Sequence, residues 1–157
     1  MEIAVAAWPD QLEEARALYR EYYSALPVEV NWPAVEQELE QLAARFDGTS
    51  SLILVATGEG AVIGAVGLRR LSDRDVELSH MYVRPDRRRR GLGRALLEAA
   101  LAAATDLGYE RVRLETVTEL VEAIALYRSA GFVPVEPYQA PPLATSLFME
   151  LDMGRKG

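Results

Sequence analysis

The chain has 157 residues, a formal net charge of −7 and 50% hydrophobic residues, which is typical of one globular domain. It contains no cysteine and one histidine, His80, so disulfides, thiolate metal sites, cysteine nucleophiles and two-histidine metal sites are excluded. No apolar run approaches the roughly 20 residues of a membrane span, and residues 1–11 lack signal-peptide features, so a cytoplasmic protein without a metal is expected.

The charge is distributed unevenly. Residues 84–94 (RPDRRRRGLGR) contain six arginines against one aspartate, a local charge of +5, which leaves −12 for the rest of the chain. An acidic body repels nucleic acid but suits a cationic substrate, while a short basic patch suits a compact polyanion such as a phosphorylated cofactor. The charges therefore indicate two ligands of opposite sign.

The first half of the chain reads as a strand, two helices and a hairpin. Asn31 is the expected N-cap of the second helix and Gly48 its end. Two apolar runs around Gly58-Glu59-Gly60 indicate the hairpin. The expected ranges are 2–7, 12–26, 31–48, and 51–57 with 61–71.

The next strand, expected over residues 75–83, has a defect in its alternation. Up to Leu78 the apolar residues occupy one phase, and from Met81 they occupy the other. A β-bulge near His80 would absorb this slip. The alternative is a strand that is buried on both faces, for which alternation carries little information.

The remaining elements complete a mixed sheet. A helix from Gly91 to Gly108, a strand over 110–117 and a helix capped by Thr118 are followed by strands over 132–135 and 146–152. Because a helix separates the strands over 75–83 and 110–117, these two should be parallel, while hairpins make the others antiparallel. The fold class is α/β (α+β), a mixed, mostly antiparallel sheet of about six to seven strands with about four helices.

The basic segment joins a strand to a helix. The first N–H groups of a helix are unpaired and carry the positive end of its dipole, glycines allow close approach, and arginines add charge-assisted hydrogen bonds. The segment therefore predicts a cradle for a di- or triphosphate group. It is neither a P-loop nor a dinucleotide-binding G-x-G-x-x-G, which disfavours ATP and NAD.

Two motifs carry a resemblance. The R-x-x-G-x-G spacing of Arg88, Gly91 and Gly93, and the block Ala123–Phe132 with its A-x-x-L-Y-x-x-x-G-F pattern, resemble the GNAT N-acetyltransferase superfamily. The resemblance covers roughly residues 51–152. It implies one N-acetyltransferase domain over 1–157, with acceptor-side helices over 8–48, an acetyl-CoA-binding strand, loop and helix over 75–108, and a C-terminal part over 118–152.

The resemblance also implies how acetyl-CoA is held. Main-chain N–H groups of the loop and helix start would bind the pyrophosphate, and the pantetheine arm would pair with the bulged strand. A backbone N–H beside the bulge, that of Met81, would polarise the thioester carbonyl. By position, the cofactor-binding residues are Met81, Tyr82, Val83, Arg88, Arg89, Arg90, Gly91, Leu92, Gly93 and Arg94.

Acyl transfer to an amine requires the ammonium to lose a proton and the departing thiolate to gain one. By resemblance, Glu77 is the expected base, directly or through water, and Tyr127 the expected acid; alternatively, Glu77 is a surface carboxylate and Tyr127 a packing aromatic. His80 is a second candidate base, but in a regular strand it points away from Glu77. Direct attack within a ternary complex is favoured over a double displacement.

Other features remain open at this stage. Leu120 occupies a position where many family members have asparagine, so a side-chain bond to the cofactor is missing. Arg87 and Arg89 can face solvent or contact the adenosine 3'-phosphate. A non-catalytic acyl-CoA sensor is the alternative function, and nucleic-acid binding is disfavoured because no stacking aromatics accompany the arginines.

The acceptor, a small-molecule or peptide amine, is not identified. Its site is bounded by the first two helices and two loops, and an exposed edge strand could pair two subunits. No membrane partner is expected. Candidate walls of the acceptor site are Tyr22, Tyr23, Glu29, Trp32, Glu136 and Tyr138, whose alternative role is packing.

Overall fold

The computed structural model describes residues 1–88, 90–141 and 143–154. One seven-stranded sheet runs in the order β1-β2-β3-β4-β5-β7-β6, and β4–β5 is its parallel pair. The strands are β1 (Glu2–Val5), β2 (Leu52–Gly58), β3 (Ala61–Arg70), β4 (Asp75–Val83), β5 (Arg111–Val117), β6 (Val133–Val135) and β7 (Ser146–Asp152). The helices are α1 (Leu12–Ala25), α2 (Trp32–Glu40), α3 (Leu42–Arg45), α4 (Leu92–Asp106) and α5 (Val121–Ser129), with a 3-10 turn over Pro85–Arg87. This confirms the predicted mixed fold, with one helix more than expected.

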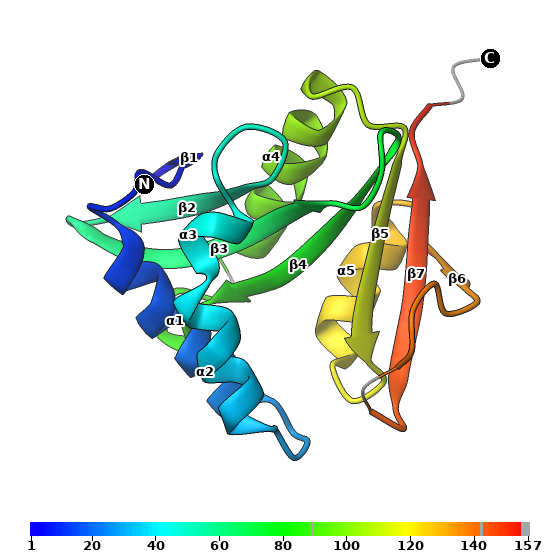
Figure 1. Ribbon diagram of the computed structural model, residues 1–157, viewed down its shortest axis with the longest axis horizontal. Coiled ribbons are helices and arrows are strands. Elements are labelled where there is room, and N and C mark those ends of the chain that lie inside the picture. Colours follow the sequence, from blue (N-terminus) through cyan, green and yellow to red (C-terminus); the bar gives the residue numbers. More distant parts are fainter. Residues whose placement is uncertain (89, 142, 155–157) are drawn as a thin grey trace.

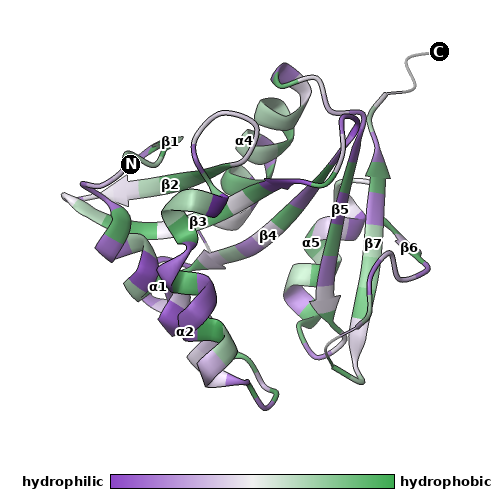
Figure 2. Cartoon of the chain, viewed as in Figure 1, coloured by the Kyte–Doolittle hydropathy of each residue, from purple (hydrophilic) through white to green (hydrophobic). Residues whose placement is uncertain are grey.

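Helices cover both faces of the sheet (Figure 1). Side chains alternate along β2, so Ile53 and Val55 pack in the cluster under α1, α2 and α3, while Leu52 and Leu54 pack with α4 on the other face. Figure 2 shows β2 and β3 largely hydrophobic and α2 rich in hydrophilic residues. The centre of the sheet is therefore buried on both sides, which explains its continuous apolar runs.

The expected single helix over 31–48 is wrong in one respect: it breaks at Gln41 into α2 and α3. The Asn31 cap is confirmed, since its side chain accepts a hydrogen bond from the N–H of Ala34 (3.2 Å). At the break, Arg16 of α1 donates its Nε to the carbonyl of Leu39 (2.8 Å) and its Nη2 to that of Glu40 (3.3 Å). In a continuous helix these carbonyls would accept hydrogen bonds from the N–H groups four residues later.

Thr118 does not cap α5, which begins three residues later with Leu120 at the N-cap. The N–H of Thr118 donates to the carbonyl of Thr145 (3.0 Å), so its backbone continues the pairing of β5 with β7. A turn then follows, closed by the N–H of Leu120 on the carbonyl of Val117 (3.0 Å).

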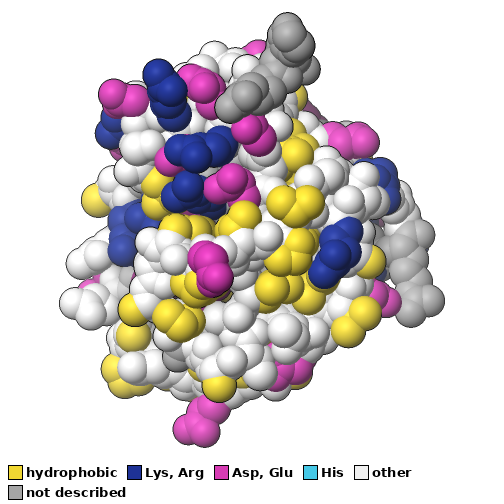
Figure 3. Space-filling view, turned by 90° about the vertical axis from the view of Figure 1, so that its right-hand side faces the viewer, with side chains coloured by type: hydrophobic (Ala, Val, Ile, Leu, Met, Phe, Trp, Pro, Cys, Tyr) yellow, Lys and Arg dark blue, Asp and Glu magenta, His cyan; other side chains and the backbone are white. Residues whose placement is uncertain are grey.

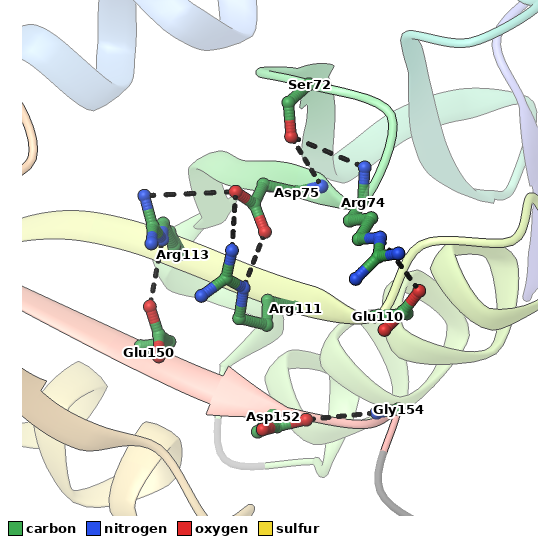
Figure 4. A network of polar contacts seen from close by, with 9 residues as sticks. All are labelled: Ser72, Arg74, Asp75, Glu110, Arg111, Arg113, Glu150, Asp152 and Gly154. Carbon is green, nitrogen blue, oxygen red and sulfur yellow. Dashed lines mark hydrogen bonds and ion pairs between the residues drawn. The ribbon is translucent and has the colours of Figure 1, made fainter.

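Strands β4 and β5 pair only at their first residues. The register ends with Glu77 opposite Arg113, after which the strands diverge (Figure 1); we call this opening the fork. Salt bridges cross its closed end, where Arg111 binds both carboxylate oxygens of Asp75 (2.7 and 3.1 Å) and Arg113 binds Glu150 (2.8 Å) (Figure 4). These ion pairs, of which only Asp75 is buried, link β4, β5 and β7 where the fork begins.

The predicted β-bulge lies in β4. Ser79 is opposite Gly67 and Tyr82 opposite Ala65, so β4 has one more residue than β3 across this interval. His80 has φ +52°, a left-handed conformation that is uncommon outside glycine. The slip in the hydrophobic alternation is therefore explained by a bulge at His80.

The far side of the molecule, formed by α5, β6 and β7, exposes hydrophobic side chains between separate basic and acidic ones (Figure 3). Val121 and Val133 are the large apolar residues most exposed on these elements. Among the described helices, no helix combines the length and the hydrophobicity that crossing a bilayer requires.

Candidate active site

A first cavity of about 520 Å³ opens in the fork. Residues of α1, α2, β4 and β5 and of the segment before β7 line it. Its polar and aromatic lining is Tyr22, Tyr23, Glu38, Arg45, Phe46, Arg69, Glu77, Ser79, His80, Glu115, Thr116, Gln139 and Ser146. The volume is that of a small-molecule site.

Glu77 lies in this cavity with both carboxylate oxygens engaged. Arg69 on β3 binds Oε1 (3.1 Å), and the hydroxyl of Tyr138 donates to Oε2 (2.7 Å). Burial, with the charge and hydrogen bond of Glu77, raises the pKa of Tyr138, so the phenol keeps its proton. Tyr138, an expected wall of the acceptor site, does not itself line the cavity but holds Glu77, which does.

The bulge brings His80 into the lining of the same cavity as Glu77, so the opposite orientation expected for a regular strand does not apply here. Nε2 of His80 lies 2.9 Å from Oε1 of Glu38 and 2.6 Å from the hydroxyl of Tyr23. Burial opposes the ionisation of Glu38, but hydrogen bonding and charge from His80, with the Tyr23 hydroxyl, lower the pKa of Glu38. A histidine with a carboxylate partner thus forms the wall opposite β5.

Tyr127 is buried among the residues on the α4 side, where its ring packs 5.8 Å from that of Phe132. It does not line the first cavity, so Glu77 and Tyr127 do not meet there. Burial and then the neighbouring Tyr22 raise the pKa of Tyr127. Tyr22 itself lines both the first cavity and the next one, which places a phenol between them.

A second cavity of about 410 Å³ continues from the first along β4. Met81, Tyr82 and Val83 line it on one side and Leu120 to Ala123 on the other. Tyr22, Leu26 and Leu120 line both cavities, so the two meet at these side chains. Leu120, which stands where the resemblance implies asparagine, therefore places an apolar side chain at this junction.

A third cavity lies at the start of α4 and shares Val83 and Arg88 with the second. Gly91, the N-cap, has φ +76°, and a Cβ there would meet nothing within 4 Å. The first intrahelical bond is that from Ala95 to the carbonyl of Gly91 (3.0 Å). The N–H groups before it face open space with the positive end of the helix dipole.

The arginines of the loop differ in their surroundings. Arg88 donates Nε to the carbonyl of Val83 (2.8 Å) and lies 5.3 Å over the ring of Tyr82. Arg94 bonds to Ser129 (3.3 Å), and Arg87 pairs with Glu59 (3.2 Å). Arg90 and Arg94 line none of the three cavities, and Arg89 is outside the described residues.

Sequence reasoning missed several residues of the first cavity. Glu38, Arg69 and Glu115 were not predicted, because a single charged residue on a helix or strand is most often solvated. The available signal for Glu115 was a carboxylate inside a segment that was otherwise predicted to be a strand. Conversely, three expected wall residues do not line the cavity: Glu29 in the loop before α2, Trp32 at the start of α2, and Glu136 after β6.

The cleft and fold define an α/β protein that can hold an extended, phosphorylated ligand between β4 and the start of α4. A sequence profile described as "Acetyltransferase (GNAT) family" matches residues 12–132. An uncharacterized N-acetyltransferase of Schizosaccharomyces pombe is 28% identical over 98% of this chain and 95% of its own length. The chain therefore belongs to the GNAT acetyltransferase family.

Solved structures agree with this fold. An acetyltransferase of the GNAT family from Staphylococcus aureus has a TM-score of 0.82 at 18% identity, over 97% of this chain and 99% of its own. A protein from Salmonella typhimurium described as a putative acetyltransferase with its cofactor acetyl-CoA has a TM-score of 0.76 at 22% identity, over 100% and 96%.

Proposed function

We propose that the protein transfers an acetyl group from acetyl-CoA to a primary amine by direct attack in a ternary complex. The observation that carries this is the continuity of the three cavities, from the open helix start at Gly91, along β4, to the carboxylates of the fork. A phosphorylated donor can enter from one end and an amine from the other. The family and the acetyl-CoA of the Salmonella relative support the same donor.

The donor fits what this chain offers. Amide groups from Gly91 to Arg94 can bind the pyrophosphate, with Arg88 beside them. Beyond Glu77, β4 has no strand partner on the side of β5 within the described residues, so Met81 to Val83 can pair with the pantetheine arm. The carboxylate of Glu122 also lines the second and third cavities, which weakens the positive potential there.

In the reaction, Glu77 removes a proton from the acceptor ammonium, directly or through water. The freed amine nitrogen forms a bond to the thioester carbon, while the N–H of Met81 donates to the oxygen on which charge develops. The carbon–sulfur bond breaks, and Tyr127 gives its proton to the departing sulfur. The nitrogen loses its second proton in this collapse, and that proton passes through water to restore Tyr127. Burial raises the pKa of Tyr127, so the phenol holds its proton until negative charge develops on the sulfur.

A non-catalytic acyl-CoA sensor is the second candidate, because the cradle would persist without transfer. The first cavity is lined by carboxylates and by a histidine–carboxylate pair, and these groups favour the enzyme. A sensor needs to bind only the acyl-CoA, so it does not require proton acceptors next to the thioester. Release of free thiol from acetyl-CoA in the presence of amines distinguishes the two.

A cytoplasmic location and a homodimer stay predictions from the sequence.

The donor site is tested with Gly91→Asp and calorimetry of coenzyme A binding. An aspartate places a negative charge where the phosphates bind, so binding should fall by at least about a hundredfold. Gly91→Ala is the matched control, because it has the same backbone strain at φ +76° but a Cβ that meets nothing within 4 Å. Unchanged binding by Gly91→Asp would remove the cradle from the proposal.

A further inference from the structure

Glu115 differs from the other carboxylates of the first cavity. Glu77 is paired with Arg69 (3.1 Å), and Glu38 lies 2.9 Å from His80 and 3.8 Å from Arg45. The recorded side-chain partner of Glu115 is the neutral amide of Gln139, which donates to Oε1 (3.1 Å). Within the described residues, Glu115 has no cation at ion-pair distance.

Among the described residues, the cavity consequently has one carboxylate without a basic partner. Three carboxylates line it with two guanidinium groups and His80, and each of these basic groups already faces Glu38 or Glu77. A half-buried carboxylate that lacks a counterion pays a desolvation cost that a bound cation would offset. A ligand carboxylate, by contrast, would find no free guanidinium and would be repelled.

Glu115 and the proposed base, Glu77, lie at different positions along the fork. Glu77 is level with Arg113, and Glu115 follows two residues later on the same face of β5. Two residues of a strand span roughly 7 Å. One end of a short chain can therefore lie at Glu77 while the other reaches Glu115.

Aromatic side chains complete this end of the cavity. Tyr22 and Tyr23 line it with rings 5.1 Å apart in an edge-to-face arrangement, and ring faces attract alkylammonium groups. Burial, then the charges of Glu38 and Glu115, raise the pKa of Tyr22 to about 12. The Glu115 carboxylate is thus close enough to act electrostatically on a phenol at the junction of the cavities.

We propose that the acceptor is a short aliphatic diamine, whose reacting amine lies at Glu77 and whose second ammonium is bound by Glu115. This rests on the proposed acetyl transfer and specifies its substrate class. The second ammonium supplies the counterion that Glu115 lacks, and the aliphatic chain lies along the aromatic wall. Transfer changes only the reacting nitrogen, so the product keeps one positive charge.

The test uses three amines with the same four-carbon chain: butane-1,4-diamine, butylamine and 4-aminobutanoate. Their second ends are positive, neutral and negative. We expect kcat/KM for the diamine to exceed that for butylamine by at least about tenfold, with 4-aminobutanoate slowest. In Glu115→Gln the ratio of diamine to butylamine should fall to about one, whereas the matched surface variant Glu98→Gln should keep it.

Equal use of butylamine and the diamine by the wild type would leave acetyl transfer standing and overturn the role of Glu115. A ratio that persists in Glu115→Gln would overturn it as well. If none of the three amines is acetylated, acetyl transfer to this class of amine is ruled out. Calorimetry then tests separately whether Glu115 binds the second ammonium. With coenzyme A bound, the wild type should bind the diamine and Glu115→Gln should not; absence of binding to the wild type overturns the subsite.

Discussion

At the scale of single residues, Tyr127 poses the sharpest question, because it is buried beside the cleft rather than in the first cavity. If it protonates the leaving sulfur, Tyr127→Phe should lower kcat by about a hundredfold and leave coenzyme A affinity unchanged. Steady-state kinetics and calorimetry measure the two effects. Tyr109→Phe is the control, since that hydroxyl bonds to the carbonyl of Ser50 (2.7 Å), away from the cavities. Full turnover by Tyr127→Phe would assign Tyr127 to packing.

The base is also a question at this scale, since the bulge brings His80 and Glu77 to one cavity. With Glu77 as base, Glu77→Gln should lower kcat/KM by roughly a hundredfold or more, and His80→Gln should lower it less. Both variants are isosteric or nearly so, and their circular dichroism should match the wild type. The reverse order of effects would make His80, oriented by Glu38, the base.

At the scale of elements, the bulge depends on the absence of a side chain at Gly67. A Cβ there would lie 2.7 Å from Oγ of Ser79 and 3.2 Å from the ring of Phe46. Gly67→Ala should therefore lower the free energy of unfolding by about 1–3 kcal/mol in urea denaturation. Because Ser79 is the nearer contact, adding Ser79→Ala should restore part of the loss. A Gly67→Ala protein as stable as the wild type would show that the bulge accommodates a methyl group.

Elements with regular patterns were predictable, and those decided by distant contacts were not. The phase change between Leu78 and Met81 indicated the bulge as one of two interpretations, because one extra residue is the simplest repair of a slipped alternation. The break at Gln41 has no local signal in the sequence, and the side chain that bonds to the carbonyls there, Arg16, is 23 residues away from Leu39. The direction of His80 depends on the local backbone at the bulge, where φ is +52°, so residue parity along a regular strand does not determine it.

At the scale of the whole molecule, Glu38 connects the helical layer to the sheet by binding His80 of β4. Burial opposes its charge, but His80 and Tyr23 lower the pKa of Glu38 below its usual 4.5. A lowered pKa contributes stability above the pKa of the unfolded state, and this is lost as pH falls through the folded-state pKa. Unfolding followed from about pH 6 to about pH 3 should thus show a steeper loss in the wild type than in Glu38→Gln. Parallel curves would mean that the contact adds nothing to stability.

The candidate site was predicted only in part, because it is assembled from segments far apart in the chain. The donor side lies in one continuous segment, so Gly91 and its neighbours were accessible from local sequence. The acceptor side combines Glu38, Glu77 and Glu115 from three separate elements, and no local pattern links them. The contact between Tyr138 and Glu77 spans 61 residues, which only the folded chain brings together.

The separation of β4 from β5 beyond Glu77 has a consequence for how such a protein can vary. If the donor pairs with β4 as proposed, its recognition there uses peptide atoms that every amino acid possesses, so substitutions along β4 can accumulate without erasing recognition. Alanine scanning would pass over this determinant. Replacing single peptide links by esters, from Met81 to Val83, would remove one donor at a time and reveal it.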